Sequence, residues 1–427
     1  MQKGGRNCQQ DVNLVSENGM IELTYDILEG ISSTHGDAFY LLDTEQFKQN
    51  FHELQKAFRK FYPQSYIAYS YKTNYTPRLC RIVDEMGGYA EVVSDMELEI
   101  ARRLNIPYDK IHFNGPIKNT EAVKAVILGG GVVNLDDYAE VPTVIALAAA
   151  HPDKIINVGL RCNFAINDGT TSRFGFDVEK PEFKELVSRL QAIENIRISG
   201  LHCHYASRRG ETWKPRAKGM CKLMDELFEE APDHMDLGGG LFGKMKNSLK
   251  AQFGIHIPTY KQYAREAAAT VAAHFKGKEQ QPKLFIEPGS ALVGDAMRFI
   301  ARVKSIKDIR GKSIATLMGS IYNINPTLNK KNPPITVLHD AKEPAKKYKD
   351  LDFAGFTCIE SDYLYRGYDG PLNIGDFVMF ENVGSYSVVL KPPFILPNFP
   401  VLELTEDGVK VIKRQETFDD LFHTFTF

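Results

Sequence analysis

Short apolar runs alternate with longer amphipathic stretches from about residue 45 to about residue 290. The apolar runs have the length of strands and end near Tyr71, Val92, Asn114, Asn134, Arg161, His204, Leu237 and Glu287. Apolar residues recur at helical spacing over residues 46–60, 76–86, 95–104, 120–128, 138–150, 181–193, 215–230 and 259–275. Capping-type residues precede several of these stretches, for example Ser94 and Asn119. Eight strand–helix alternations in roughly 245 residues predict a TIM-type (β/α)8 barrel.

The pattern changes after about residue 290, where helical periodicity fades and turn signals become frequent. The expected strands lie at 296–306, 313–317, 353–359, 376–380, 387–389 and 401–405. The segment 21–42 is also interpreted as strand-like and as part of this second region. We therefore predict two domains: a barrel over residues 45–290, and an all-β sandwich or small β-barrel formed by residues 1–44 and 291–427.

Composition excludes several classes of protein. The 427 residues carry a formal net charge of −2 with acids and bases interspersed, so nothing marks a surface for nucleic acid or an anionic membrane. Six cysteines without CxxC spacing suggest neither a disulfide framework nor a zinc site. His202 and His204 share a strand face, but no further ligand cluster follows, so no metal is expected. The lack of a long apolar run and of an apolar leader makes a cytoplasmic location the expectation.

Polar residues that can do chemistry stand at the predicted strand ends, where TIM barrels carry their catalytic groups. They are Lys72, Glu91, Asn114, Arg161, His204, the glycines Gly238, Gly239 and Gly240, and Glu287. A lysine at the end of the first strand points its amine into the barrel mouth, where it can hold a carbonyl as a Schiff base. Three glycines directly after a strand let backbone amides approach a phosphate, although a simple tight turn would use the same residues.

These motifs, in this order, resemble those of the fold-type III pyridoxal-phosphate enzymes, which include ornithine and diaminopimelate decarboxylases and, more distantly, alanine racemase. The resemblance extends from about His35 to Ile395. It rests on Tyr-Ser-Tyr-Lys-Thr-Asn at 69–74, Gly-Leu-His-Cys-His-Tyr-Ala-Ser at 200–207, Asp-Leu-Gly-Gly-Gly at 236–240, Phe-Ile-Glu-Pro-Gly at 285–289, Gly-Phe-Thr-Cys at 355–358 and Val-Gly-Ser-Tyr at 383–386. It implies pyridoxal 5'-phosphate as the cofactor and decarboxylation of an amino acid as the reaction.

The resemblance also implies a role for each matching residue. Lys72 would hold the cofactor as a Schiff base, Glu287 would keep the pyridine nitrogen protonated, and His204 would stack on the ring. Cofactor contacts are further implied for Glu91, Arg161, Ser207, Gly238, Gly239, Gly240, Gly289, Ser290 and Tyr386, whereas Arg173 is expected to be structural.

One position departs from the family pattern. Relatives usually carry an arginine directly after Glu-Pro-Gly, where it helps to hold the phosphate, and this chain has Ser290 there. Phosphate binding is then expected to rest more on the glycine loop, Ser207 and Tyr386.

Cys358 matches a cysteine that, in relatives, enters the neighbouring subunit's site and gives a proton to the decarboxylated carbon. A thiol with a reference pKa of about 8.5 is mostly protonated at neutral pH and can do so. The alternative for such a cysteine is a buried apolar residue. The resemblance therefore implies a homodimer with shared active sites.

The substrate motif is also altered. Diaminopimelate decarboxylases grip the distal carboxylate with the arginine of Ile-Arg-Pro-Ala-Leu-Tyr, and the counterpart here is Ile-Asn-Pro-Thr-Leu-Asn at 324–329. We hypothesise a larger or neutral-tailed amino acid, such as the carboxylated amine end of a siderophore or peptide-conjugate intermediate. The expected substrate contacts are Asn325, Asn329, Ile359, Glu360 and Tyr386, with Lys330, Lys331 and Arg366 as possible partners of an acidic tail.

Three alternatives stay open at this level. One is diaminopimelate, ornithine or lysine decarboxylation proper. A racemase would need a second base and a longer run after its lysine, from which Tyr75-Thr76-Pro77 departs. A non-catalytic cofactor carrier would be a single barrel, so the second domain argues against it.

Overall fold

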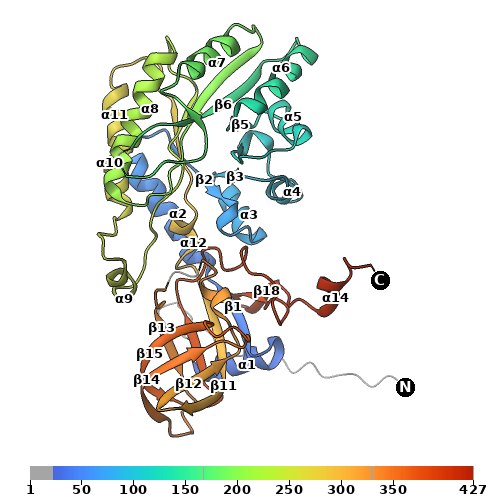
Figure 1. Ribbon diagram of the computed structural model, residues 1–427, viewed down its shortest axis with the longest axis vertical. Helices are drawn as coiled ribbons and strands as arrows, with labels where there is room; N and C mark the ends of the chain where they lie inside the picture. The colour runs from blue at the N-terminus through green and yellow to red at the C-terminus, as the bar shows by residue number, and fades with distance from the viewer. Residues whose placement is uncertain (1–22, 167, 328–329, 427) are drawn as a thin grey trace. The chain divides into compact units, whose positions relative to one another are not determined.

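The structure is a computed structural model that describes residues 23–166, 168–327 and 330–426. Its internal contacts divide the chain into two units, both drawn in Figure 1. The first comprises Thr44–Ala296 together with Gly384–Val389. The second comprises the described residues up to Asp43, Met297–Val383 and the segment from Leu390 onward. In the described part of the chain, no helix is both long and apolar enough to cross a membrane.

A closed barrel of eight parallel strands forms the first unit. Neighbouring strands follow the order β5-β4-β3-β2-β10-β9-β8-β6, and the pairing of β5 with β6 closes the ring. The strands are β2 (Ser65–Ser70), β3 (Tyr89–Val92), β4 (Ile111–Phe113), β5 (Val132–Leu135), β6 (Ile156–Asn163), β8 (Ile196–His202), β9 (His234–Asp236) and β10 (Lys283–Ile286), with the short β7 (Phe176–Asp177) beside β6. The predicted TIM-type barrel is confirmed, and every strand ends within two residues of its predicted end.

Helices connect the barrel strands, as the periodicity predicts (Figure 1). They are α2 (Thr44–Arg59), α3 (Pro77–Glu85), α4 (Asp95–Arg103), α5 (Thr120–Leu128), α6 (Val141–Ala150), α7 (Pro181–Gln191), α8 (Trp213–Leu227), α9 (Asn247–Lys250), α10 (Tyr260–Glu266), α11 (Ala268–Phe275) and α12 (Ser290–Val293). In α2 the apolar stripe Phe47, Phe51, Leu54 and Phe58 recurs every three to four residues and is buried, which fixes the face that packs inward. The Ser94 hydroxyl caps α4 by accepting from the Glu97 N–H at 3.2 Å.

A mixed nine-stranded sheet forms the frame of the second unit. Its main path is β15-β14-β12-β11-β1-β17-β18, and β16 pairs with both β11 and β13. The strands are β1 (Ala38–Leu42), β11 (Met297–Ile309), β12 (Lys312–Leu317), β13 (Ile335–Leu338), β14 (Lys346–Ala354), β15 (Tyr363–Leu372), β16 (Phe377–Phe380), β17 (Val401–Thr405) and β18 (Gly408–Lys413). The N-terminal strand β1 lies between β11 and β17, so residues from both ends of the chain complete this sheet.

The prediction that segment 21–42 is strand-like is wrong in its first half. Residues Tyr25–His35 form helix α1, whose first turn begins at Thr24, where the hydroxyl accepts from the Ile27 N–H. Ile27, Leu28 and Ile31 are buried at helical spacing in the core of this unit. Two short helices, α13 (Ile321–Ile324) and α14 (Phe418–Phe422), also belong to it, so the all-β description is corrected to a β-sheet domain with added helices.

Two further predictions for this region need correction. Residues 387–389 form a turn rather than a strand, and they group with the barrel unit although 291–427 was assigned to the second domain. The strand expected at 353–359 ends at Ala354 and begins at Lys346. Its first half is mostly exposed and rich in lysine, so it carries no apolar pattern that the sequence could reveal.

Candidate active site

Side chains from distant parts of the sequence meet at the carboxyl ends of the barrel strands. They surround a cavity of about 220 Å3. The predicted residues in its wall are Lys72, His204, Gly240, Glu287, Gly289, Ser290 and Tyr386. Ser70, Thr73, Ala206, Arg208 and Leu241 complete the wall, and sequence reasoning did not single them out.

Lys72 reaches this cavity because β2 stops at Ser70 and the chain makes a single 3-10 turn before α3. Its amine forms an ion pair with Glu91 on β3, and the Ser70 hydroxyl donates to the same carboxylate at 2.6 Å. Burial lowers the pKa of Lys72, but the nearby Glu91 and Glu287 raise it to a net value above the ordinary one. The lysine is therefore held as an ammonium ion, with 31% of its side chain exposed toward the opening.

Glu287 places a negative charge on the cavity wall. The Asn114 amide donates to its carboxylate, while His202 Nε2 lies 3.2 Å and His204 Nδ1 3.4 Å from its oxygens. Burial opposes ionisation of Glu287, but His202 and Lys72 bring its pKa well below the usual range. The carboxylate is almost fully buried and stays ionised.

A second carboxyl, Asp236, lies behind Glu287 and has the opposite character. It is buried, it accepts from the Gly238 N–H at 2.8 Å, and its other oxygen lies 3.2 Å from His112 Nδ1. Burial and the adjacent Glu287 charge raise the pKa of Asp236 well above the ordinary value. Of these two neighbouring carboxyl groups, Glu287 is therefore ionised and Asp236 is protonated. Such a difference between two adjacent acids is common in active sites. His202, Asp236 and Glu287 bring ligand-type atoms within 4.8 Å of one another, but hydrogen bonds of Asp236 and Glu287 already use oxygens of both carboxyls.

His204 presents a neutral ring to the cavity. The Gly239 N–H donates to its Nδ1 at 3.0 Å, so this nitrogen carries the lone pair. Burial lowers the pKa of His204 to about 4, although the contact with Glu287 opposes the shift. The ring is uncharged at neutral pH, and a neutral flat face suits stacking against an aromatic ring.

The glycine run after β9 makes the tight backbone turn that its sequence predicts. Gly238 and Gly240 adopt φ of +67° and +90°, which only glycine adopts readily. Sequence reasoning missed Arg216, a fully buried arginine of α8 that donates to the carbonyl oxygens of Leu237 and Gly239 at 3.0 and 2.7 Å. These bonds fix the orientation of the loop peptides. In the sequence, the only sign of this role is that Arg216 stands on the apolar face of the helix predicted at 215–230.

Residues 46–294 match the family model described as pyridoxal-dependent decarboxylase, pyridoxal binding domain. The chain belongs to the pyridoxal-dependent decarboxylase family. The match covers the barrel, which is the part of the molecule that contains the Lys72 cavity.

Relatives cover almost the whole chain. It is 28% identical to the diaminopimelate decarboxylase of Methanocaldococcus jannaschii over 93% of this chain and 92% of that protein. It is 25% identical to the diaminopimelate decarboxylase of Aquifex aeolicus, with 92% of each chain covered. A crystal structure of the M. jannaschii diaminopimelate decarboxylase superposes with a TM-score of 0.83 at 25% identity, covering 93% of this chain and 94% of that one. The barrel joined to a mixed-sheet domain is therefore the fold-type III architecture of this decarboxylase family.

The residues present fit the cofactor of the decarboxylase family. Lys72 offers an amine for its aldehyde, Glu287 an ionised carboxylate for its ring nitrogen, and His204 a neutral face for its ring. A methyl group at Gly239 would overlap the Glu287 carbonyl oxygen, so the loop lies as close to this wall as a glycine allows. The same cavity combines all of these groups, which is what a phosphorylated pyridine aldehyde requires.

Several predicted cofactor contacts of the decarboxylase family have other partners here. Arg161 pairs with Asp136 at 2.8 Å and stacks over Phe174, outside the cavity wall. The Ser207 hydroxyl is also absent from the wall and accepts weakly from the Arg209 N–H at 3.5 Å. Arg173 lies over the Phe174 ring at 4.0 Å, as expected of a structural residue.

Tyr386 lies in the wall because its segment is tied to the barrel. Its N–H donates to the Thr73 carbonyl oxygen at 2.9 Å, and the Asn74 amide donates to the Gly384 carbonyl oxygen at 3.0 Å. Tyr386 itself has a positive φ of +66°, an uncommon conformation for a tyrosine. The Gly-Ser-Tyr motif thus reaches the cavity that contains Lys72.

The remaining predicted residues belong to the second unit. Cys358 and Glu360 are exposed, and Ile359 is half-buried in the same loop. Asp362 holds this loop by accepting from the hydroxyls of Ser320 and Thr357 at 3.0 and 2.6 Å. Asn325 follows helix α13 and accepts from the Thr327 hydroxyl at 3.0 Å. Asn329 lies outside the described residues.

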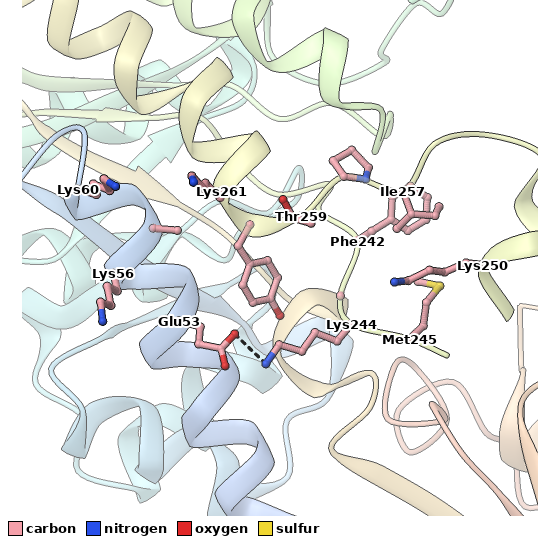
Figure 2. Close-up of a pocket in the computed structure, with 14 residues that line it drawn as sticks. Glu53, Lys56, Lys60, Phe242, Lys244, Met245, Lys250, Ile257, Thr259 and Lys261 are labelled. Carbon is pink, nitrogen blue, oxygen red and sulfur yellow. Dashed lines mark ion pairs between the residues drawn. The ribbon is translucent and has the colours of Figure 1, made fainter. Parts of the chain in front are cut away.

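A larger cavity of about 510 Å3 lies between α2, α10 and the segment after the glycine loop (Figure 2). It is lined by Lys56, Lys60, Lys244, Lys250 and Lys261 around apolar residues such as Phe242. Figure 2 shows Lys244 reaching Glu53, with which it pairs at 2.8 Å. Among the described residues that line this space, no acid–base pair is buried, so the size of the cavity does not make it the reaction site.

Proposed function

We propose that the protein removes the α-carboxylate of an amino acid, and that Lys72 is the residue that binds the cofactor covalently. The observation that carries the proposal is the shared cavity of the Lys72 ammonium group, the ionised Glu287 and the neutral His204. Pyridoxal phosphate, when bound, draws the electron pair left by the departing carboxylate into its ring. Family membership supports the reaction, and the cavity supports the assignment of the residues.

The side chains around Lys72 have complementary roles in this proposal. Glu91 and the Ser70 hydroxyl hold the amine at the mouth of β2, where the substrate amine can exchange with it. Glu287 keeps a proton on the ring nitrogen, and the Asn114 amide keeps the carboxylate turned inward. The neutral His204 ring covers one face of the site without adding a charge that would compete with Glu287.

We further propose Cys358 as the acid that returns a proton to the α-carbon. The hydrogen bonds that Asp362 accepts hold the Cys358 loop in place. In this loop the Cys358 side chain is exposed rather than buried in the core of its unit. In the family that the chain resembles, the matching cysteine enters the neighbouring subunit's site, so the proposal includes a homodimer in which each site takes residues from both copies.

For the substrate, we propose an amino acid whose distal end is not a free amino-carboxylate, such as a conjugate of the siderophore or peptide type. Asn325 supports this because a short amide cannot form the bidentate, charge-assisted pair that an arginine makes with a carboxylate. Diaminopimelate is the second candidate, and the names of the relatives favour it. Both substrates would use the same cavity chemistry and would differ only in the groups that hold the distal end.

The Lys72 assignment is tested by borohydride reduction of the purified protein loaded with pyridoxal phosphate. We expect an absorption band near ~420 nm that reduction abolishes, and peptide mass spectrometry should find the pyridoxyl group on Lys72. The Lys72→Ala variant should bind cofactor without this covalent link and should release no carbon dioxide. A pyridoxyl group on any other lysine would contradict the assignment.

The substrate proposal needs a separate assay, because its failure leaves the cofactor chemistry intact. Carbon dioxide release should be compared for diaminopimelate, ornithine, lysine and a set of diamino acids acylated on the distal amine. We expect the highest kcat/KM for an acylated substrate. Ordinary turnover of free diaminopimelate would replace the first candidate with the second.

A further inference from the structure

The cavity contains a cation that no sequence motif assigns. Arg208 follows the His204 strand end and lines the same cavity as Lys72, Gly240 and Ser290. Its Nη2 lies 3.4 Å from the Ser290 hydroxyl oxygen. Ser290 follows Glu-Pro-Gly, where the family resemblance leads us to expect a phosphate-binding arginine, so Arg208 lies next to the position of the missing charge.

We propose that Arg208 binds the phosphate of the cofactor and replaces the arginine that is absent at position 290. A guanidinium group can bind two phosphate oxygens at once, which a serine hydroxyl cannot do. The inference depends on the cofactor that the family shares and not on the identity of the substrate.

Contacts at both ends place the Arg208 side chain. The Tyr263 hydroxyl donates to the Arg208 carbonyl oxygen and accepts from the Phe242 N–H at 3.1 Å. The guanidinium group lies 5.6 Å from the centre of the Phe242 ring, an arrangement that favours a cation. Arg208 is therefore held against the segment that follows the glycine loop, at the same wall as Gly240.

The charge of Arg208 is not neutralised by a neighbouring acid. Among the described residues, no carboxylate lies within ion-pair distance of its guanidinium group. The next residue, Arg209, differs, because 59% of its side chain is exposed and it approaches Glu211 at 4.0 Å. A cation left without an acidic partner at a cavity wall has its full charge available for an anionic ligand.

Other basic groups near the cavity are already engaged. Lys72 pairs with Glu91, and Arg161 pairs with Asp136. Lys244 turns to Glu53 in the larger cavity, as Figure 2 shows. Within the described part of the chain, Arg208 is thus the cavity-lining cation that has no acidic partner.

Positions 208 and 290 lie next to each other in the cavity wall, because the Arg208 guanidinium group contacts the Ser290 hydroxyl and both residues line the cavity. An arginine at 290 would bring a second positive charge next to Arg208. A single phosphate group can be bound by one arginine, whether that arginine stands at position 208 or at position 290.

The test is an equilibrium titration of the full-length protein, freed of cofactor, with pyridoxal phosphate and, separately, with pyridoxal. For Arg208→Gln we expect a Kd for pyridoxal phosphate about 10- to 100-fold higher, because one charge-assisted contact is lost. The Kd for pyridoxal, which has no phosphate, should stay within about twofold. Arg209→Gln is the matched control and should leave both constants unchanged.

A rescue variant makes the test specific. The double substitution Arg208→Gln with Ser290→Arg should recover most of the lost affinity for pyridoxal phosphate, because it returns the charge from the other side. An equal loss for pyridoxal and pyridoxal phosphate, or no loss for either, would overturn the proposal. If Arg208→Gln does not fold, Arg208→Lys takes its place, and again only a loss confined to the phosphorylated ligand supports the role.

Discussion

Glu97 shows how one buried acid can serve a helix and still respond to pH. It stands in the first turn of α4, and its carboxylate accepts from the Val93 N–H at 2.9 Å. Burial and the neighbouring Glu91 raise its pKa to about 7, despite the bond from Val93 and the charge of Lys72. The pKa of Glu97 therefore lies near physiological pH, although an acid in the first turn of a helix usually serves only as a partner of the helix dipole.

This shift predicts a pH-dependent stability difference between the wild type and Glu97→Gln. The folded protein binds the Glu97 proton more tightly than the unfolded chain, so this contribution is complete below about pH 4.5 and is lost as the pH rises through about 7. Relative to the variant, the free energy of unfolding of the wild type should fall by about 2.5 kcal/mol between pH 5 and pH 8. Urea unfolding of both proteins with saturating cofactor measures this difference. Parallel pH profiles would show that Glu97 does not carry the shift.

At the residue scale, the sequence predicted the side chains that stand at strand ends better than those that stand in loops. Lys72, His204 and Glu287 line the cavity because a strand end fixes the direction of its last side chains. Arg208 escaped prediction because it lies in an irregular segment whose course depends on Tyr263 and Phe242, both distant in sequence. The same dependence on remote partners explains Arg161, which turns to Asp136 instead of entering the wall.

At the scale of elements, the glycine loop after β9 carries a steric requirement in addition to a conformational one. Gly240 has a φ of +90°, and a Cβ there would lie 2.9 Å from the Ser207 carbonyl oxygen and 3.0 Å from that of Tyr205. Gly254 has a φ of +65° but has nothing within 4 Å of such a Cβ. The two positions therefore separate backbone strain from crowding.

We expect Gly254→Ala to lower the free energy of unfolding by about 1 kcal/mol, the cost of a left-handed alanine, with no effect on cofactor binding. Gly240→Ala should lower it by more, because the Ser207 and Tyr205 backbone must also move. The displaced loop should raise the Kd for pyridoxal phosphate about 10-fold or more. Urea unfolding and cofactor titration of the two variants provide the comparison, and equal effects at both positions would rule out crowding.

The elements themselves were predictable where burial imposes a pattern. Parallel barrel strands are covered on both faces and read as apolar runs, so all eight were found. Strand β15 was missed because much of it is half-exposed and it contains Gly367, Gly370 and Pro371, which signal turns. Helix α1 was predicted as a strand because its short apolar stretch is compatible with helical spacing and with strand alternation. Only its packing against residues such as Phe377 decides between the two.

At the scale of the whole molecule, the proposed reaction needs groups from both units. Lys72 and Glu287 belong to the barrel unit, and Cys358 is exposed on a loop of the sheet unit. If each active site takes Lys72 from one copy and Cys358 from the other, two different single variants can complement each other. Neither Lys72→Ala nor Cys358→Ala alone leaves any site with both residues.

We therefore predict that a heterodimer of Lys72→Ala and Cys358→Ala chains regains activity. One of its two sites contains both substitutions and the other contains neither, so the purified heterodimer should have about half the wild-type kcat per dimer. Two different affinity tags on the coexpressed chains isolate this species, and each variant purified as a homodimer is the control. If both residues of a site came from one chain, every site would keep one substitution and mixing would restore nothing. Failure to isolate a doubly tagged species would contradict the dimer, and an unchanged rate for Cys358→Ala would remove the thiol from the reaction.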